Sequence, residues 1–287
     1  MNDLLIRFLY GTVPGRGILK LLLNTGADRI IVRFLRSPWS RPLIPWYARR
    51  HNVNLDRFQL RDYRTFRDFF ARKCSYNCID YVPEHLISPC DGWLTAYPIE
   101  EDSSFFIKGM QYRLEDLLDD SLLAKHYEGG TCMVFRLCAS DYHRYCYIDD
   151  GYLWQNHYIP GVLHSVQPIA CETYPVYMLN RRCWCLMVTR SFGPVVQTEI
   201  GVLVVGGIVN HQENTRVFRG DEKGCFELAG SSIVLLFEPN RVRLISGIRR
   251  ESEAGREVRV RQGMWIGTRC SKPTTSEQNN QNKIQSQ

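Results

Sequence analysis

The sequence lacks both a long apolar run and a signal peptide, and each absence excludes a class of protein. No stretch of its 287 residues approaches the roughly 20 consecutive apolar residues of a transmembrane helix. The N-terminus also lacks the successive basic, apolar and small-residue segments of a secretory signal. We therefore expect neither a membrane-spanning helix nor a secreted protein.

The cysteines lack the spacing of a metal site or of a disulfide framework. There are 11 of them, an odd number, scattered along the chain. The closest pairs, Cys74 with Cys78 and Cys183 with Cys185, do not have the two-residue gap of a zinc knuckle, and no histidine pair follows at finger spacing. We expect no metal ligands, and we expect reduced thiols in the cytosol.

Positive charge is concentrated at the N-terminus, and the rest of the chain is almost neutral. The net charge is +6, but residues 1–50 alone hold nine lysines and arginines against two aspartates, which is +7. The remaining 237 residues carry 27 basic and 28 acidic groups, which is −1. An anionic surface is the expected partner of residues 1–50, and nucleic acid is not an expected partner.

Residues 1 to about 70 are predicted to be helical, with an amphipathic pattern. Apolar residues recur near helical spacing, with basic residues between them and aromatic residues just after. An apolar face with arginines and nearby tryptophans suits a helix lying in the plane of an anionic membrane. The same stripe suits a helix packed on its own domain, and the pattern does not separate the two. The residues concerned are Ile18, Leu21, Leu22, Ile30, Ile31, Phe34 and Leu35, with Lys20, Arg29, Arg33 and Arg36, then Trp39, Trp46 and Tyr47.

Short apolar runs separated by glycine, proline and aspartate follow from about residue 85 and predict strands. One helix is expected to interrupt them, from Leu114 to His126, because leucines recur there at helical intervals. The fold class is therefore α+β: an N-terminal helical, membrane-facing layer plus a mostly antiparallel β core domain. We place the helical region at residues 1–75, the β-rich domain at 76–270 and a polar, disordered tail at 271–287.

A break of small residues precedes an apolar run near the C-terminal end. Ala229-Gly230-Ser231-Ser232 comes directly before the run from Ile233 to Phe237. A turn or bulge before a core strand explains this pattern by itself, because glycine and serine dominate turns. The alternative is that Gly230-Ser231 is a peptide bond that its own serine breaks.

Three further stretches contain residues typical of chemical sites, although each is weak evidence alone. SPCDG places Asp91 at the tight start of a strand, which is also good turn chemistry. KGMQYRL enters the leucine-rich helix. SDYHRYC places His143 between Tyr142 and Arg144, and histidine is the usual proton carrier near neutral pH, although a lone histidine is more often structural.

Together, and in this order, these stretches resemble the phosphatidylserine decarboxylase family. SPCDGWL is similar to the family's strand start, KGMQYRLEDLL to its Lys-Gly-x-x-Tyr-x-Leu segment, and LCASDYHRYCYIDDG to its Asp-Tyr-His-Arg loop. PGVLHSVQPIA resembles the segment after that loop, FRGDEKGCFELAGSSIVLLFE the processing site, and VRQGMWIG the C-terminal region. Six matches in order cover most of the chain and point to the bacterial branch.

The resemblance implies a proenzyme that cuts itself between Gly230 and Ser231. Ser231 would attack the carbonyl of Gly230, and the serine would end as a pyruvoyl group at the start of a new chain. The products would be a β chain of residues 1–230 and an α chain of residues 231–287. The pyruvoyl ketone, the implied cofactor, binds the substrate amine and withdraws electrons as CO2 leaves, a role otherwise filled by pyridoxal phosphate. The implied reaction converts phosphatidylserine into phosphatidylethanolamine.

The resemblance also assigns roles, with one departure. Asp91 and Ser231 match the aspartate and serine of the family's self-cleavage triad, but Cys146 stands where the family has the triad histidine. His143 matches the histidine near the substrate, and we expect its neighbours Tyr142 and Arg144 to bind substrate. Cys146 as a thiolate, His143 in both roles, or His164 or His85 near Asp91 remain open as the base.

Two alternatives follow from that departure and from the chemistry. The first is a lipid-binding relative that keeps the fold and never cleaves, for which Cys146 is the only support. The second is a pyruvoyl enzyme for a soluble amino acid. The leading expectation is a peripheral protein on the cytoplasmic side of the cell membrane, with phosphatidylserine in an anionic membrane as its partner. A homodimer is left open.

Overall fold

The computed structural model describes residues 3–24, 27–56, 58, 62–74, 78–107, 110–161, 175–201, 207–228 and 231–270. Three features predicted from the sequence lie outside these residues. They are the scissile residue Gly230, the candidate base His164 and the tail at 271–287.

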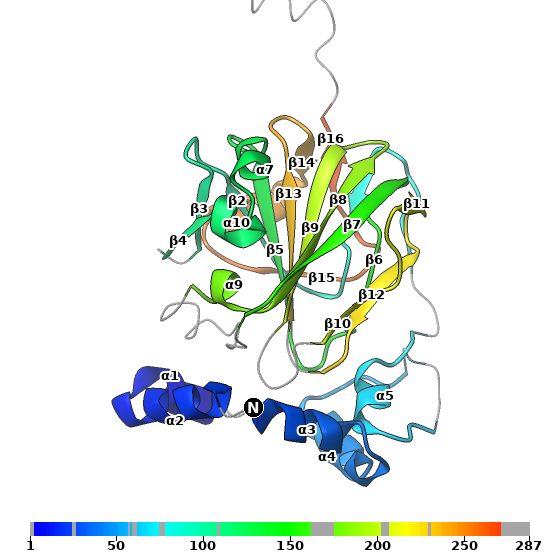
Figure 1. The fold of residues 1–287 in the computed structure, drawn as a ribbon. Coiled ribbons are helices and arrows are strands. Elements are labelled where there is room, and N and C mark those ends of the chain that lie inside the picture. Colours follow the sequence, from blue (N-terminus) through cyan, green and yellow to red (C-terminus); the bar gives the residue numbers. More distant parts are fainter. Residues whose placement is uncertain are drawn as a thin grey trace, which may run out of the picture.

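The N-terminal region is helical, as predicted. Its elements are α1 (Asp3–Gly11), α2 (Val13–Asn24), α3 (Ala27–Leu35), the 3-10 helix η1 (Pro38–Ser40), α4 (Leu43–Arg50) and α5 (Phe66–Phe70). Helix α5 begins where the Thr65 side chain accepts the N–H of Asp68, which satisfies one free donor of the first turn. Figure 1 shows these helices along one end of the β-rich part.

The β-rich part is built around one sheet of eight strands in the order β11-β7-β8-β9-β13-β5-β2-β15, and every pair in it is antiparallel. The strands are β2 (Gly92–Pro98), β5 (Thr131–Leu137), β7 (Gly151–Ile159), β8 (Arg182–Thr189), β9 (Gly193–Gly201), β11 (Thr215–Val217), β13 (Ser231–Phe237) and β15 (Val258–Val260). The predicted mostly antiparallel β core is confirmed.

Three smaller sheets are formed by other strands of the described residues. One has the order β10-β12-β6, from β10 (Ile208–Asn210), β12 (Glu222–Phe226) and β6 (Arg144–Cys146). The second has the order β1-β16-β14, from β1 (His85–Ile87), β16 (Trp265–Arg269) and β14 (Val242–Leu244). The third pairs β3 (Ser104–Ile107) with β4 (Met110–Arg113). Two further helices are α9 (Val176–Leu179) and α10 (Ser246–Glu253).

Strand β13 lies between the two halves of the hydrophobic core. All seven of its residues are buried. Ile233, Leu235 and Phe237 pack into one cluster, and Val234 and Leu236 into the cluster on the opposite face. Because successive side chains on a strand point to opposite faces, an uninterrupted apolar run here is the signature of a strand covered on both sides.

The single helix predicted from Leu114 to His126 is wrong in its length. The structure has two short helices, α6 (Leu114–Leu118) and α7 (Ser121–Lys125). Asp119 adopts the left-handed conformation, which ends α6, and the Asp120 side chain accepts the N–H of Leu123, which begins α7. The leucine spacing could not reveal this break, because α6 buries three leucines in the same core against which Ala124 and Leu123 of α7 pack.

The N-terminal helices pack partly on the rest of the chain. Leu9 and Tyr10 of α1 are buried against Tyr112 and Tyr177, and Leu35 and Ile44 pack around Phe69. Other apolar residues of the same region stay on the surface: Ile30, Ile31, Phe34, Trp39 and Trp46. Among the described residues, no helix is both long and apolar enough to cross a bilayer.

Candidate functional site

The register of three adjacent strands brings the separate motifs to one end of the large sheet. Ser231 at the start of β13 lies opposite Leu137, the last residue of β5. Trp93 of β2 lies opposite Arg136, so Gly92 comes next to Leu137 on the other side of β5. A Cβ at Gly92 would lie 2.9 Å from the carbonyl oxygen of Arg136, so the strand start requires glycine. The loop with His143 follows Leu137 directly.

Ser231 and Ser232 point to opposite faces of the sheet. Opposed residues on neighbouring strands share a face, and side chains alternate along a strand. Ser231 therefore shares its face with Ile233 and Leu137, and Ser232 shares the other face with Val234. Both serines are buried, and Ser231 is only 1% exposed. A group formed at residue 231 is thereby shielded from bulk water.

Asp91 is buried, and the C-terminal motif holds it in place. Its Oδ1 accepts the backbone N–H of Gln262 at 2.9 Å. The side-chain amide of Gln262 donates to the carbonyls of Pro89 at 3.2 Å and Arg144 at 3.1 Å. Gln262 thus joins the strand start that carries Asp91 to the strand that follows His143.

His143 lies in the interior beside the strand that leads to the scissile bond. Its ring stacks on Phe70 of α5, with centroids 4.0 Å apart, and its carbonyl accepts the N–H of Phe226 at 2.9 Å. Neither ring nitrogen has a hydrogen-bond partner among the described residues. Burial, and next the positive charge of Arg72, lower the pKa of His143 to about 3, offset in part by the Cys138 backbone. The imidazole is therefore neutral at physiological pH, and in this environment it is a weak proton acceptor.

Cys146 occupies the same corner but is poorly suited to be a base. Its backbone N–H donates to Pro89 at 2.9 Å, and its thiol lies 3.9 Å from the carbonyl of Ser88. Burial raises the pKa of the thiol to about 12, and the neighbouring charges of Asp221 and Asp91 add to the rise. At neutral pH the thiolate that general-base chemistry needs is scarcely populated.

The other predicted residues are held by the protein itself. The Tyr142 hydroxyl accepts the N–H of Cys74 at 3.4 Å, and the Arg144 guanidinium donates to Ala71 at 2.9 Å and to Glu222. The suggestion that His85 approaches Asp91 is wrong. His85 instead binds Asp80 at 2.8 Å and stacks on Trp265, because the turn before β1 brings Asp80 to it.

Comparison with known proteins places the sequence among enzymes of one kind. The sequence profile described as phosphatidylserine decarboxylase matches residues 66–268. The chain belongs to the phosphatidylserine decarboxylase family. Phosphatidylserine decarboxylase proenzyme 2 of Clostridium acetobutylicum is 40% identical over 266 residues, 91% of each chain. The proenzymes of Clostridium perfringens and Ruminiclostridium cellulolyticum are 33% and 35% identical and cover 91% and 94% of this chain, and 92% and 93% of their own.

The family predicted from the six motifs is thus confirmed, and with it the class of enzyme, a decarboxylase made as a proenzyme. Nothing in these comparisons favours the non-cleaving, lipid-binding alternative. The roles of individual residues and the boundaries at residues 75 and 270 stay predictions. The part of the chain that the structure describes contains no group of three or more potential metal ligands.

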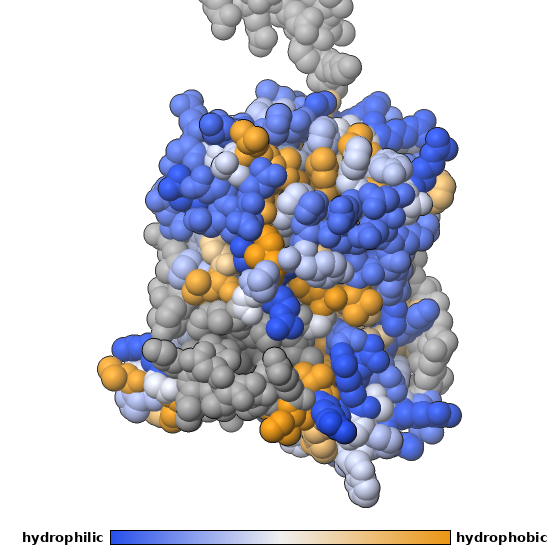
Figure 2. Space-filling view, in the orientation of Figure 1, coloured by the Kyte–Doolittle hydropathy of each residue, from blue (hydrophilic) through white to orange (hydrophobic). Residues whose placement is uncertain are grey.

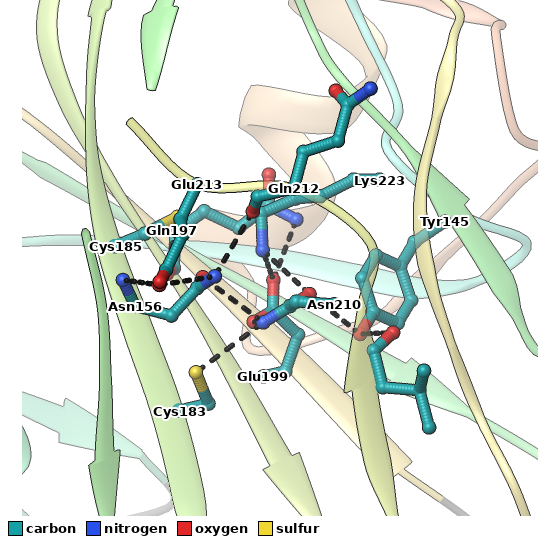
Figure 3. A network of polar contacts seen from close by, with 11 residues as sticks. Tyr145, Asn156, Cys183, Cys185, Gln197, Glu199, Asn210, Gln212, Glu213 and Lys223 are labelled. Atoms are coloured by element: carbon teal, nitrogen blue, oxygen red, sulfur yellow. Dashed lines mark hydrogen bonds and ion pairs between the residues drawn. The ribbon is translucent and has the colours of Figure 1, made fainter. Parts of the chain in front are cut away.

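Sequence reasoning missed a buried polar network on the same face as Ser231. Lys223 of β12 and Glu199 of β9 form an ion pair with a distance of 2.7 Å, and both side chains are fully buried. Asn210 accepts from Lys223 at 2.9 Å and donates to Glu199 at 3.1 Å, and Tyr145 of β6 donates to Asn210 at 3.0 Å. Figure 3 shows these groups converging between the strands.

This network joins the two sheets that supply the site. Lys223, Asn210 and Tyr145 lie on the three strands of the small sheet. His143 directly precedes β6 and accepts the N–H of Phe226, the last residue of β12, so His143 and the segment that leads to Ser231 lie at the same end of this sheet. Glu199 lies on β9 of the large sheet, opposite Ile233, and is a diagonal neighbour of Ser231, a relation that places Cα atoms about 7–8 Å apart. The network therefore fixes the small sheet relative to the strand that begins with Ser231.

A second missed contact holds the segment just before the predicted cleavage site. Glu227 is buried, and its carboxylate binds Arg36 at 2.5 Å and also Arg67 of α5. Its backbone N–H donates to Gly207 at 2.9 Å. Residue 227 thus joins the N-terminal helices to the chain three residues before Gly230.

Replacing Glu227 with glutamine is expected to slow self-cleavage about tenfold, because a charge-assisted hydrogen bond contributes about 1.5–3 kcal/mol and its loss frees the segment before the scissile bond. A time course of fragment formation on a denaturing gel measures the rate. Glu238→Gln is the matched control, since Glu238 pairs with Arg241 at 2.7 Å at the other end of β13. Equal cleavage rates for Glu227→Gln and Glu238→Gln would show that the ion pairs of Glu227 do not affect self-cleavage.

Proposed function

We propose that this protein is a self-processing, pyruvoyl-dependent phosphatidylserine decarboxylase that converts phosphatidylserine into phosphatidylethanolamine. The observation that carries the proposal is the convergence of Asp91, the His143 loop and Ser231 at one end of β2, β5 and β13. Family membership supplies the reaction, and the buried serine at a strand start supplies its centre. The names of the relatives specify the same substrate.

Self-cleavage begins with attack of the Ser231 Oγ on the carbonyl of Gly230, while its proton passes to a base. The peptide C–N bond breaks, and residue 230 becomes an ester on Ser231. Removal of the Ser231 α-proton then expels the Gly230 carboxylate by β-elimination. The resulting dehydroalanine is hydrolysed to a ketone with release of ammonia. The β chain ends at 230 and the α chain begins at 231, so the seven buried residues of β13 hold the new terminus.

The residues around position 231 fit a pyruvoyl group. Such a group supplies a ketone that binds the substrate amine and withdraws electrons when CO2 leaves. Ser231 is buried between β5 and β9, which keeps competing water away. His143 has two ring nitrogens without partners among the described residues, so a ring nitrogen is available to relay a proton once substrate is bound.

His143 is the better candidate for the base of self-cleavage, in addition to its role toward substrate. Its pKa of about 3 leaves the ring neutral with a free lone pair, although weakly basic, whereas the pKa of about 12 leaves the Cys146 thiol protonated and unable to accept a proton. In this assignment Asp91 contributes its negative charge and its hydrogen bond to Gln262 at the site, and no histidine is required at position 146. This assignment explains how a chain with cysteine at that position processes itself.

Cys146→Ser is expected to keep the self-cleavage rate within about twofold of wild type, because a thiol with a pKa near 12 supplies roughly one thiolate in 10⁵ at pH 7. His143→Gln is expected to lose cleavage. The rates are compared by pulse-chase of freshly synthesised protein on gels. Loss of cleavage in Cys146→Ser would assign the base to Cys146, and Cys146→His should speed maturation if a base at 146 is what limits it.

Peripheral binding to the cytoplasmic side of an anionic membrane completes the proposal. Trp39 is 83% exposed and Ile30 is 75% exposed, and both lie among the arginines of the N-terminal region. Figure 2 shows apolar patches at the end of the molecule where Figure 1 places these helices. Apolar anchors with basic neighbours suit such a surface, and each arginine contributes about 1 kcal/mol there.

The experiment that tests the function is decarboxylation of phosphatidylserine by the purified protein. Release of CO2 and formation of phosphatidylethanolamine are expected, with faster turnover on anionic vesicles than on free serine. Decarboxylation of a soluble amino acid at the same rate would instead favour the alternative function, a pyruvoyl enzyme that acts on a soluble amino acid.

A further inference from the structure

Two cavities adjoin at the junction of the N-terminal helices and the β-rich part. The first, of about 480 Å³, lies between α5 and the small sheet, and its lining includes Arg144 and Glu227 beside the site. The second, of about 560 Å³, lies among η1, α4 and the following loop. Asp62 and Tyr63 line both cavities, so the two share one wall. Each volume is in the range of small-molecule sites.

The first cavity has an excess of positive charge. Five of its lining residues are lysine or arginine and three are acidic. Two of the acidic groups are already neutralised, since Asp62 pairs with Arg41 at 2.5 Å and Glu227 with Arg67. Arg144 forms an ion pair with Glu222, which is not among the residues that line this cavity. We call the first cavity the cationic cavity.

Three cations of the cationic cavity form no ion pair with a described residue, although Asp141 and Asp91 act on the second of them through space: Arg64, Arg72 and Lys73. Arg72 is buried and donates only to backbone carbonyls, at 2.8 Å to Asp141 and 3.1 Å to Ser140. Arg64 and Lys73 are exposed at the rim, and only Asp68 in the lining is left to face them. Arginine and lysine at such a rim suit a phosphate group.

The second cavity is apolar by composition. Trp39, Pro42, Ile44 and Pro45 contribute to its lining, and its charged pair, Arg41 with Asp62, is neutral overall. Trp39 at its edge is also the most exposed large apolar residue of the described chain. An apolar cavity that shares a wall with a cationic one, on the side where the membrane is proposed to lie, matches an amphiphile with an anionic head.

We propose that the two cavities bind one molecule of the substrate phospholipid. The cationic cavity takes the phosphodiester, with Arg64 and Lys73 as its ligands, and the apolar cavity takes the first part of an acyl chain against Trp39 and Ile44. The headgroup then extends past Arg144 toward His143. This assignment rests on the proposed function and adds to it the residues that determine lipid recognition.

The test uses mature, cleaved enzyme and phosphatidylserine diluted in neutral detergent micelles, which removes general attraction to an anionic surface. Arg64→Ala with Lys73→Ala is expected to raise KM at least about tenfold, because two charge-assisted contacts to phosphate are lost, and to leave kcat within about twofold. The matched control is Arg190→Ala with Arg243→Ala, which removes two exposed cations from the other side of the β-rich part and is expected to keep both constants. Unchanged KM in the Arg64/Lys73 double variant would overturn the assignment.

Soluble competitors separate a phospholipid site from a general anion site. Glycerophosphoserine, which has the head but no acyl chains, is expected to inhibit the wild type and to inhibit the Arg64/Lys73 double variant at least about tenfold more weakly. Inorganic phosphate that inhibits as well as glycerophosphoserine would show an anion site only and would contradict the proposal. If the wild type itself does not decarboxylate phosphatidylserine, the proposed function fails, whereas an active wild type with an indifferent double variant defeats this inference alone.

Discussion

Ser231→Ala is expected to abolish self-cleavage and decarboxylation together. In the proposed mechanism the hydroxyl is both the nucleophile that breaks the chain and the precursor of the ketone, so its loss removes both steps. Alanine should fit the site, because residue 231 is an ordinary strand position opposite Leu137 and Gly201. The variant should therefore accumulate as a folded, full-length chain on a denaturing gel, with no measurable release of CO2.

Ser232→Ala is the matched control, one residue away on the opposite face of the same strand. The Ser232 hydroxyl is buried and has no hydrogen-bond partner among the described residues, so its removal breaks no contact there. Normal cleavage and activity are expected for it. Ser231→Thr and Ser231→Cys retain a nucleophile and should cleave slowly. Decarboxylation by Ser231→Ala at the wild-type rate would show that the cofactor does not come from this serine.

Lys223→Met is expected to have the largest effect on stability, about 3–5 kcal/mol, because it leaves the Glu199 carboxylate buried without its partner. Tm should fall by about 10 °C on that account. Lys223→Met combined with Glu199→Gln should recover part of the loss, because both charges are then absent. Differential scanning calorimetry on the purified variants measures the change.

The same variants test whether the network positions the site. Arg219→Met breaks another buried ion pair, with Asp149 at 3.0 Å, which is not part of the network around Lys223. At a temperature where both variants are folded, Lys223→Met should cleave more slowly than Arg219→Met, because Lys223, unlike Arg219, contacts Glu199 of β9 from the small sheet. Equal cleavage rates for the two variants would limit the network to a structural role. An unchanged Tm of Lys223→Met would contradict the prediction that Glu199 is destabilising when it is buried without a partner.

The strands and the order of the motifs were predictable because their signals are local. Short apolar runs after residue 85 form strands, for example β7, and the apolar run after Ser231 is the central strand β13. The Gly-Ser break predicts Ser231 as the reacting residue only together with the family motifs, because a turn before a core strand explains the same residues. The N-terminal helices were predicted from their spacing in the same way.

The remaining features depend on contacts between distant parts of the chain. Lys223 and Glu199 are 24 residues apart, and each alone reads as a solvated charge, since burial of lysine and glutamate is rare without a partner. Glu227 meets Arg36 across 191 residues. His85 was suggested as a neighbour of Asp91 because it lies close to SPCDG in sequence. Sequence proximity does not specify the direction of a side chain, and His85 binds Asp80. The pKa values of His143 and Cys146 follow from burial, which the motif does not reveal.

The intact mass of the purified wild-type protein tests the central claim most directly. Self-cleavage between Gly230 and Ser231 predicts two chains of about 27 and 6–7 kDa, in proportion to their shares of the 33.5 kDa chain, and the smaller one should begin with a blocked, carbonyl-bearing residue. Active protein that measures as one 33.5 kDa species would contradict the account.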